Sequence, residues 1–424
     1  MDLLAAAVPL FLLALLVELA VDRRRETGHY RLNDAINSLS AGTLSTTFDY
    51  FTRILPIYVS GWVLQEYALF DIDVARFDAS LSGLTFWLLA LLAWDFCYYW
   101  AHRCGHEVSI LWANHAVHHQ SEDYNLSTAL RQPSTGFLFN WIFYLPLFLV
   151  GLPLEVVATV NAIDLIYQFW VHTQHIGKLG WADRVFVTPS NHRVHHAQNE
   201  MYIDKNYGGI LVVWDRLFGT FQEELDEHPV VFGVRKPLSS WNPFRSISQV
   251  YAYLWFDAVR TKRWRDKIGV WFRRTGWRPP DMEAQYPRRA ASVDEFEKFD
   301  PAISRPLKRY VIGQFLVATL AVLGIGQLFA QAGASAVIAP CAGLWSALFS
   351  FGALLEGREQ GRRIELIRLL VVTPVAAIAT VWGGYAGDGL VPAVLLYAGV
   401  SVIALSRVPS KPSLLVEGQS GQTV

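Results

Sequence analysis

Ten of the twelve histidines in this chain fall into four short clusters between residues 102 and 196. The clusters are His102 with His106, His115 with His118 and His119, His172 with His175, and His192 with His195 and His196. Imidazole is the commonest metal ligand in proteins, and one four-coordinate zinc needs far fewer than ten. The histidines therefore predict two metal ions in one nitrogen-rich site.

The spacing within the clusters favours shared helix faces. His102 and His106 are one helical turn apart, so both side chains can face one point. In each H-x-x-H-H motif, the histidines at positions i and i+3 are also expected on one face. The alternative is a set of ordinary surface or core histidines, which explains one cluster more easily than four.

The composition is that of a membrane protein. Hydrophobic residues make up 52% of the chain, charged residues only 17%, and the mean hydropathy is +0.25. A formal net charge of −1 argues against nucleic acid as the main partner. The three cysteines, Cys97, Cys104 and Cys341, are too few and too scattered for a disulfide framework.

Apolar runs of about 20 residues predict membrane-spanning helices. The first half of the chain has such runs at Leu3–Val21, about Leu39–Leu64, Leu84–Ala101 and Phe137–Trp170. The last run is too long for one helix, and Gly151-Leu152-Pro153 interrupts it where a hairpin would turn. Four more runs follow at about Tyr310–Gln331, Ala334–Leu355, Ile364–Tyr385 and Leu390–Ser406. We therefore expect an all-α, polytopic helical membrane protein.

Positive charge predicts the orientation of these helices. Arg23–Arg25 follow the first run and place its end in the cytoplasm. Counting crossings from there puts all four histidine clusters on the cytoplasmic side, in a helical cap that holds the metal site. The first run has no basic residue before it and no cleavage site after it, so we interpret it as an anchor. Short loops and the lack of a targeting or retention signal favour a bacterial inner membrane over the endoplasmic reticulum.

The chain is expected to have four parts. They are a membrane-embedded core at 1–240, a cytoplasmic basic amphipathic segment and linker at 241–308, four C-terminal transmembrane helices at 309–407, and a cytoplasmic tail at 408–424. Between Arg260 and Arg278 there are eight Lys or Arg residues against a single acid, with three tryptophans interleaved. This pattern predicts a helix that lies on an anionic lipid surface.

The order of the four clusters resembles the fatty acid hydroxylase and sterol desaturase superfamily of membrane di-iron oxygenases. Three longer strings are similar to its alkylglycerol monooxygenase branch. They are AVHHQSEDYNLSTALRQ at Ala116–Gln132, YQFWVHT at Tyr167–Thr173, and TPSNHRVHHAQNEMYIDKNYGGILVVWDRLFGTF at Thr188–Phe221. The likeness covers about residues 30–280, and the C-terminal part only in hydropathy.

The resemblance implies two iron ions, dioxygen as co-substrate, and hydroxylation of a C–H bond of a lipid substrate. Carried over position by position, the ligands would be His102, His106, His115, His118, His119, His172, His192, His195 and His196. His175 stays open, because the broader hydroxylases often have a second histidine near there and the alkylglycerol branch typically does not. That branch uses a reduced pterin as electron donor, although the sequence contains no pterin motif.

The residues themselves fit this chemistry. Iron accepts imidazole ligands well. The chain has no cysteine set for an iron–sulfur cluster and no glycine-rich dinucleotide fingerprint, so electrons must come from an external reductant or electron-transfer partner. Asp95, Asp164 and Gln168 lie seven, eight and four residues before a histidine. Each is expected to accept the free ring N–H of a ligand and fix its tautomer, the alternative being an interhelical hydrogen bond.

Two other functions are compatible with parts of the pattern. A sterol or fatty-acid desaturase or a carotenoid hydroxylase would use the same metal site, and its product would distinguish it. A metal transporter or sensor belongs to a different class and predicts ligands within the membrane spans, along a route through them. The histidine clusters lie outside the apolar runs, which favours the enzyme.

Overall fold

The computed structural model describes residues 3–77, 80–288 and 292–409. Within this described part, the regular structure is helical, with three isolated β-bridges and no strand. The predicted all-α fold is therefore confirmed. The chain forms two compact units, one of residues 1–239 and 243–299 and one of residues 240–242 and 300–424. Unit 1 contains all four histidine clusters.

Unit 1 begins with three helices, α1 (Leu3–Arg25), α2 (Leu32–Thr52) and α3 (Ile54–Tyr67). The single span predicted at about Leu39–Leu64 is wrong, because the helix is interrupted at Arg53. Helix α2 is rich in Ser, Thr, Asn and Asp, and it buries many of these polar side chains inside the unit. Burial of hydrogen-bonded polar groups suits a helix packed in protein rather than one exposed to lipid.

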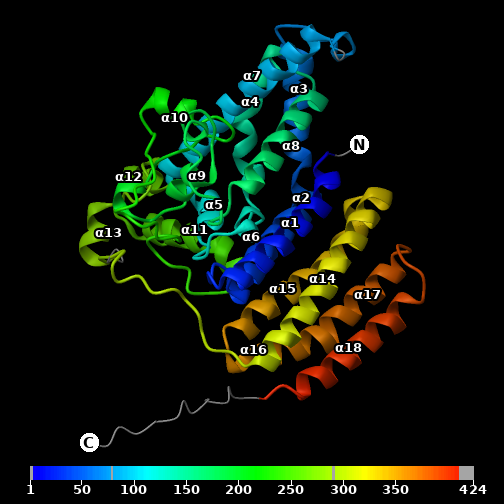
Figure 1. Cartoon of the computed structure of the whole chain (residues 1–424). Coiled ribbons are helices and arrows are strands. Elements are labelled where there is room, and N and C mark those ends of the chain that lie inside the picture. Colours follow the sequence, from blue (N-terminus) through cyan, green and yellow to red (C-terminus); the bar gives the residue numbers. More distant parts are fainter. Residues whose placement is uncertain (1–2, 78–79, 289–291, 410–424) are drawn as a thin grey trace, which may run out of the picture. The chain divides into compact units, whose positions relative to one another are not determined.

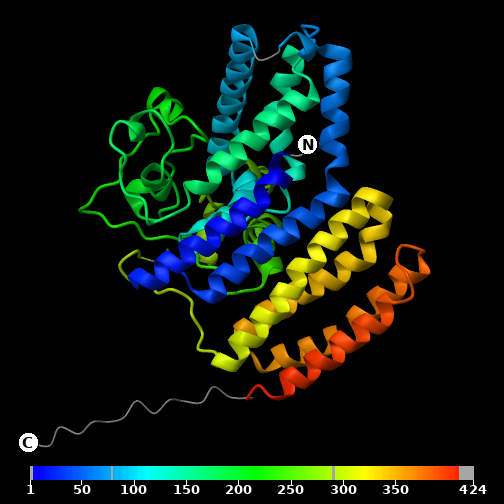
Figure 2. The same cartoon turned by 45° about the vertical axis from the view of Figure 1, so that its right-hand side comes forward.

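Two long helices lead to the histidines. They are α4 (Leu81–Glu107) and α8 (Leu154–Trp170), which pack against each other (Figures 1 and 2). The predicted break before α8 is confirmed, since α7 (Leu145–Val150) ends at Gly151 with φ of 106°. A Cβ at Gly151 would lie 2.0 Å from the carbonyl oxygen of Phe70, so the turn requires glycine.

Shorter helices complete unit 1. They are η1 (Val74–Arg76), α5 (Ser109–His119), α6 (Leu126–Ala129), η2 (Gly136–Leu138), η3 (Asn140–Tyr144), η4 (Ala182–Arg184), α9 (Pro189–His195), η5 (Glu200–Tyr202), α10 (Val213–Phe218), α11 (Pro243–Arg260), α12 (Trp264–Phe272) and α13 (Pro280–Gln285). Helix α11 packs against α5. The predicted basic amphipathic stretch forms the end of α11 and all of α12, where Trp264, Ile268 and Phe272 are exposed at four-residue spacing.

Unit 2 is a helical bundle of α14 (Arg305–Ala332), α15 (Ala334–Leu355), α16 (Glu359–Ile367), the π-helical turn η6 (Arg368–Val372), α17 (Thr373–Trp382) and α18 (Leu390–Ser406). These helices follow the four C-terminal apolar runs. Inside the bundle, the carboxylate of Glu365 accepts hydrogen bonds from Arg368, Tyr310 and Ser350. Of the predicted tail at 408–424, residues 410–424 lie outside the described part.

Among the residues that the structure describes, four helices are long and apolar enough to cross a membrane: Leu81–Glu107, Arg305–Ala332, Ala334–Leu355 and Glu359–Trp382. Asn140–Val150 and Leu390–Ser406 are shorter apolar helices.

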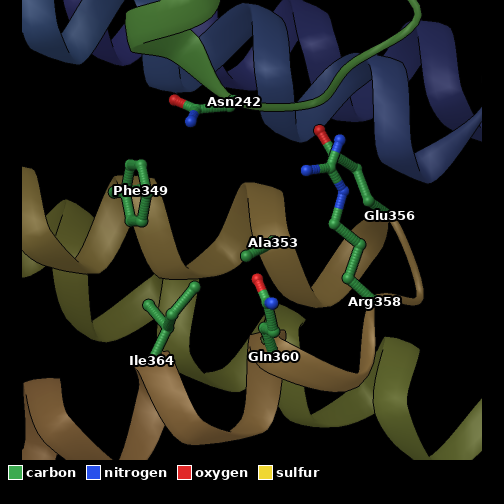
Figure 3. Close-up of a pocket in the computed structure, with 8 residues that line it drawn as sticks. Asn242, Phe349, Ala353, Glu356, Arg358, Gln360 and Ile364 are labelled. Carbon is green, nitrogen blue, oxygen red and sulfur yellow. The ribbon is translucent and has the colours of Figure 1, made fainter.

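Unit 2 also contains the small pocket that Figure 3 shows. The charged side chains that line it are paired with nearby residues. Glu356 accepts hydrogen bonds from Ser240 and the backbone N–H of Trp241, and it forms an ion pair with Arg358. No histidine lines this pocket.

Candidate metal centre

Nine histidines of unit 1 come together in two groups. The five-histidine group consists of His102, His106, His115, His119 and His195, and the four-histidine group of His118, His172, His192 and His196. Within each group, one ring nitrogen per residue can be chosen so that all lie within 4.8 Å of one another. All but one of these residues are buried, His115 being partly exposed. The groups adjoin, since the rings of His119 and His196 stack with centroids 4.3 Å apart.

Each H-x-x-H-H motif contributes to both groups. His115 and His119 belong to the five-histidine group, whereas His118 belongs to the four-histidine group. The expected pairing of positions i and i+3 is therefore wrong, and positions i and i+4 pair instead. At about 100° per residue, i+4 lies about 40° beyond a full turn and i+3 lies about 60° short of it. The histidines at positions i and i+4 thus serve one group, and the neighbouring histidine at i+3 serves the other. One motif can therefore supply ligands to two metal ions.

The Nε2 atoms are spaced as neighbouring ligands of a metal are. In the four-histidine group, Nε2 of His172 lies 3.2 Å from that of His118 and 3.1 Å from that of His192. In the five-histidine group, Nε2 of His115 lies 3.0 Å from that of His102 and 3.1 Å from that of His119. Ligands about 2.1 Å from a metal are about 3.0 Å apart in octahedral and about 3.4 Å apart in tetrahedral geometry.

The tautomers of His118 and His172 exclude a hydrogen bond between their neutral rings. Nδ1 of His118 donates to the carbonyl of Arg131 at 2.9 Å, and Nδ1 of His172 donates to the carbonyl of Gln168 at 2.8 Å. A carbonyl only accepts, so in each neutral ring the proton is on Nδ1 and the Nε2 lone pair is bare. Two lone pairs that face each other at 3.2 Å repel, and a cation that both can ligate relieves the repulsion. These residues therefore fit a metal ion.

Burial keeps the imidazoles neutral. It lowers the pKa of His118 to about 4, and it lowers those of His192, His195 and His196 well below their usual value. Neighbouring imidazoles add to the effect on His192, His195 and His196, because a second positive charge beside a first is unfavourable. Metals bind the neutral form, so the site is in the ligating protonation state at neutral pH.

A loop between α9 and α10 orients two ligands of the five-histidine group. Nδ1 of His102 donates to the carbonyl of Tyr207 at 2.8 Å, and Nδ1 of His195 donates to the carbonyl of Lys205 at 3.0 Å. The buried carboxylate of Asp215 holds this loop by accepting the backbone N–H groups of Tyr207 and Gly208 at 2.7 and 2.8 Å. The position of these two rings therefore depends on the shape of residues 205–215.

Asp95 fastens the same loop to α4. Its carboxylate accepts the backbone N–H groups of Ile210 and Leu211 at 2.8 and 3.1 Å, and the indole N–H of Trp214 at 2.9 Å. Asp95 was expected to accept a ring N–H of a ligand histidine. That expectation is wrong, because the described hydrogen bonds of this carboxylate go to the loop, and Nδ1 of His102 donates to the carbonyl of Tyr207. Asp95 acts on His102 only through the backbone that it positions.

The two other predicted hydrogen-bond acceptors also have different partners. The carboxylate of Asp164 accepts the indole N–H of Trp94 at 3.1 Å, and the side-chain oxygen of Gln168 accepts from the hydroxyl of Tyr98 at 2.8 Å. The expected side-chain contacts to His172 are therefore wrong. The carbonyl of Gln168, in the last turn of α8 and four residues before His172, takes that role instead.

Gly209 lies where the loop passes closest to α4 and α8. A Cβ at this position would lie 2.8 Å from Cδ1 of Tyr98, 2.9 Å from Oδ1 of Asp164 and 3.0 Å from Oδ1 of Asp95. Glycine therefore allows the backbone to approach the carboxylate that holds it.

Arg131 contacts both the end of α5 and a ligand of the four-histidine group. Its guanidinium is almost completely buried, and it donates to the carbonyl of Val117 at 2.6 Å and to the side chains of Gln120 and Ser246. Its own carbonyl accepts from His118. The sequence placed Arg131 just after the second cluster but gave no sign of this double role.

The structure places His175 outside both groups. It lies beside His29 and Asp22, with which it forms a separate cluster. Glu107, next to His106, pairs with Arg103 at 3.1 Å.

Comparison with known proteins agrees with this geometry. The family model "Fatty acid hydroxylase" matches residues 87–220, which include all nine histidines. The chain is 36% identical over 378 residues to alkylglycerol monooxygenase of Homo sapiens, covering 87% of this chain and 81% of the relative. It is 36% identical over 375 residues to that of Danio rerio, covering 86% and 80%. The ornithine lipid hydroxylase OlsE of Rhizobium tropici is 35% identical over 135 residues, covering 32% and 41%.

No solved structure matches the chain. By their names, these relatives are a monooxygenase of alkylglycerols and a hydroxylase of ornithine lipids. The long apolar helices of this chain agree with a multi-pass membrane protein. The chain therefore belongs to the alkylglycerol monooxygenase family, within the fatty acid hydroxylases, and it is a membrane-bound monooxygenase that hydroxylates a lipid.

Proposed function

We propose that the nine histidines hold two iron ions and that the enzyme hydroxylates an alkylglycerol ether lipid. The observation that supports this most is the convergence of nine imidazoles in two adjoining groups, where the unprotonated Nε2 atoms of His118 and His172 face each other. The substrate class comes from the relatives named alkylglycerol monooxygenase, which match over most of their length. When bound, two ferrous ions would supply electrons for activating dioxygen toward an unreactive C–H bond.

The protein's own part in the reaction is to fix the ligands. Backbone carbonyls of Arg131, Gln168, Lys205 and Tyr207 hold the rings of His118, His172, His195 and His102 in one tautomer and one orientation. A ring fixed in this way does not need to reorient when the metal changes charge.

Aromatic side chains exclude water from one side of the site. Tyr124 is almost completely buried and stacks on Phe232 with ring centroids 4.7 Å apart. The Tyr124 ring also lies 5.1 Å from that of His196 and 5.6 Å from that of His172. A dry site protects a strong oxidant from reaction with solvent.

Helix α4 offers a path for an alkyl chain. Leu84, Leu88 and Leu92 are exposed at four-residue spacing, so one apolar stripe faces lipid in the membrane. The same helix carries His102 and His106 at its C-terminal end. A lipid chain that lies along this stripe would approach the end of α4 that carries the two histidines. The exposed Trp264, Ile268 and Phe272 of α12 would rest on the membrane surface.

We also propose an external donor, of which a reduced pterin is the first candidate because the family branch uses one. The basic residues Arg23–Arg25 at the end of α1 support a cytoplasmic location of the histidines. The assignment to a bacterial inner membrane stays a prediction.

The test is turnover of an alkylglycerol by the full chain in lipid nanodiscs, with dioxygen labelled with oxygen-18 and a reduced pterin. Hydroxylation at the carbon next to the ether oxygen gives a hemiacetal, which opens to a labelled aldehyde. The acyl ester analogue and the His118→Ala/His195→Ala variant serve as controls and should give no product. A product with a new double bond would indicate a desaturase instead. Turnover of sterols or free fatty acids alone would overturn the proposed alkylglycerol substrate. Turnover with a ferredoxin system but not with a reduced pterin would overturn only the proposal that a pterin is the electron donor.

A further inference from the structure

A third cluster of metal-ligating side chains lies in unit 1 beside the nine histidines but separate from them. It consists of Asp22, His29 and His175, and their ligand atoms lie within 4.8 Å of one another. Two of these residues are close in the sequence, and the third lies far from them. Asp22 is in the last turn of α1, His29 is in the connection from α1 to α2, and His175 lies three residues after His172.

Two nitrogens in this cluster are buried without a partner. Nδ1 of His29 and Nε2 of His175 make no hydrogen bond to the described residues and are shielded from solvent. The two rings lie with centroids 5.0 Å apart. A buried polar atom without a partner is unfavourable, and here two such atoms lie near the same carboxylate. A shared ligand would satisfy both nitrogens.

The carboxylate is held by one of its oxygens. Oδ1 of Asp22 accepts from the hydroxyl of Thr27 at 2.7 Å and from the backbone N–H of His29 at 2.8 Å. The described hydrogen bonds of this carboxylate all go to Oδ1, which leaves Oδ2 available to a cation. Asp22 is only 5% exposed, so its charge is poorly compensated by water.

The backbones that carry the two histidines are also fixed. The side-chain amide of Asn125 donates to the carbonyl of His29 at 2.8 Å. The backbone N–H of His175 donates to the hydroxyl of Thr173 at 3.1 Å, and this hydroxyl in turn donates to Glu18, one helical turn before Asp22. The backbone therefore holds both imidazoles beside the carboxylate of Asp22.

We propose that Asp22, His29 and His175 bind a third metal ion, a divalent first-row transition metal such as Zn²⁺ or Fe²⁺. Two imidazoles and one carboxylate are a common ligand set for both ions and leave the remaining positions to water. The ion would join the connection between α1 and α2 to the segment that follows His172. It would therefore brace a ligand of the four-histidine group without belonging to that group.

The test is the metal content of the full chain, purified in detergent without oxygen and measured by plasma mass spectrometry. Wild-type protein should contain three metal ions per chain, and His29→Gln should contain two. His228→Gln alters an exposed histidine and should keep three. An unchanged metal content in His29→Gln would overturn the proposal, since the cluster would then be only a group of neighbouring side chains. Loss of more than one ion in His175→Ala, but not in His29→Gln, would place His175 in the main site and also overturn it.

A second measurement guards against variants that fold poorly. Both imidazoles of the third cluster are partly exposed, so a mild chelator should remove its ion before those of the buried groups. Returning one equivalent of Zn²⁺ to treated wild-type protein should raise its Tm, and the same addition to His29→Gln should not. An equal rise in both proteins would contradict the proposal. The His118→Ala/His195→Ala variant should lose the ions of the nine-histidine site and keep the third ion. The two sites can therefore be tested separately.

Discussion

The Nε2 atoms of His118 and His172 lie 3.2 Å apart, and each ring gives its Nδ1 proton to a backbone carbonyl. The protein therefore sets the tautomer of both rings with groups that cannot change their protonation. The two bare nitrogens face each other across a gap that suits a cation. The same logic applies to His102 and His195, whose partners are the carbonyls of Tyr207 and Lys205.

Replacing Asp95 with Asn should weaken the metal site from a distance. The amide keeps the shape of the carboxylate but turns one acceptor into a donor, which would then face N–H groups of Ile210, Leu211 or Trp214. A buried donor without an acceptor costs about 1–3 kcal/mol. We expect a lower Tm in detergent and partial loss of iron, because the loop that carries Tyr207 shifts.

The control for this variant is Asp226→Asn, whose side chain is 86% exposed. It should leave both the Tm and the iron content unchanged. If Asp95→Asn behaves like this control, Asp95 does not position the loop.

Replacing Gly209 with Ala should be more harmful than the loss of one hydrogen bond. The added methyl group would lie within 3.0 Å of Tyr98, Asp164 and Asp95, and a packed core has no room to move all three. We expect little folded protein, or folded protein without iron. Gly177→Ala, where the added Cβ meets nothing within 4 Å, should fold and bind iron normally. Normal iron content in Gly209→Ala would show that the loop is not tightly packed.

Glu122 should make stability depend on pH. Burial raises its pKa from the usual 4.5 to about 7, although the backbone N–H of Phe299 and the guanidinium of Arg31 oppose the shift. A raised pKa means that the folded state binds the proton more tightly than the unfolded state. This contribution to stability is complete below about pH 4.5 and is lost as the pH rises through about 7.

Glu122→Gln removes this titration while keeping an oxygen that can accept both hydrogen bonds. The unfolding free energy of wild-type protein relative to the variant should therefore fall by at most ~3 kcal/mol between pH 5 and pH 8, since one pKa unit is worth about 1.4 kcal/mol. The Tm of wild-type protein relative to the variant should fall over the same range. Glu227→Gln, at an exposed site, should show no such trend. A pH-independent difference between wild-type and Glu122→Gln would contradict the raised pKa.

The sequence predicted the helical membrane fold and the convergence of nine histidines because both depend on local patterns. Apolar runs mark long helices wherever they occur, and i to i+4 spacing fixes a shared face, as at His102 and His106. The prediction of one span at about Leu39–Leu64 was wrong because the average hydropathy of this segment hides the polar residues that α2 buries inside unit 1. Hydropathy alone does not distinguish lipid from protein as the surrounding medium.

The hydrogen-bond partners of the ligands could not be predicted for a different reason. Every residue carries a carbonyl, so nothing in the sequence marks those of Lys205 and Tyr207 as special. Their positions result from contacts of Asp95 and Asp215 with the loop, which only the folded chain brings together. His175 has the spacing of a ligand, but it lies beside Asp22 of α1 and His29 of the connection after α1 instead.

The iron content of the protein tests most directly whether the nine histidines hold two irons. Full-length protein purified in detergent without oxygen should be compared with His118→Ala/His195→Ala, which removes one ligand from each group, and with the exposed control His228→Ala. We predict that the double variant contains two fewer irons per chain than wild-type protein, while the control keeps them. Equal iron content in all three proteins, or zinc in place of iron in the wild type, would contradict the di-iron site.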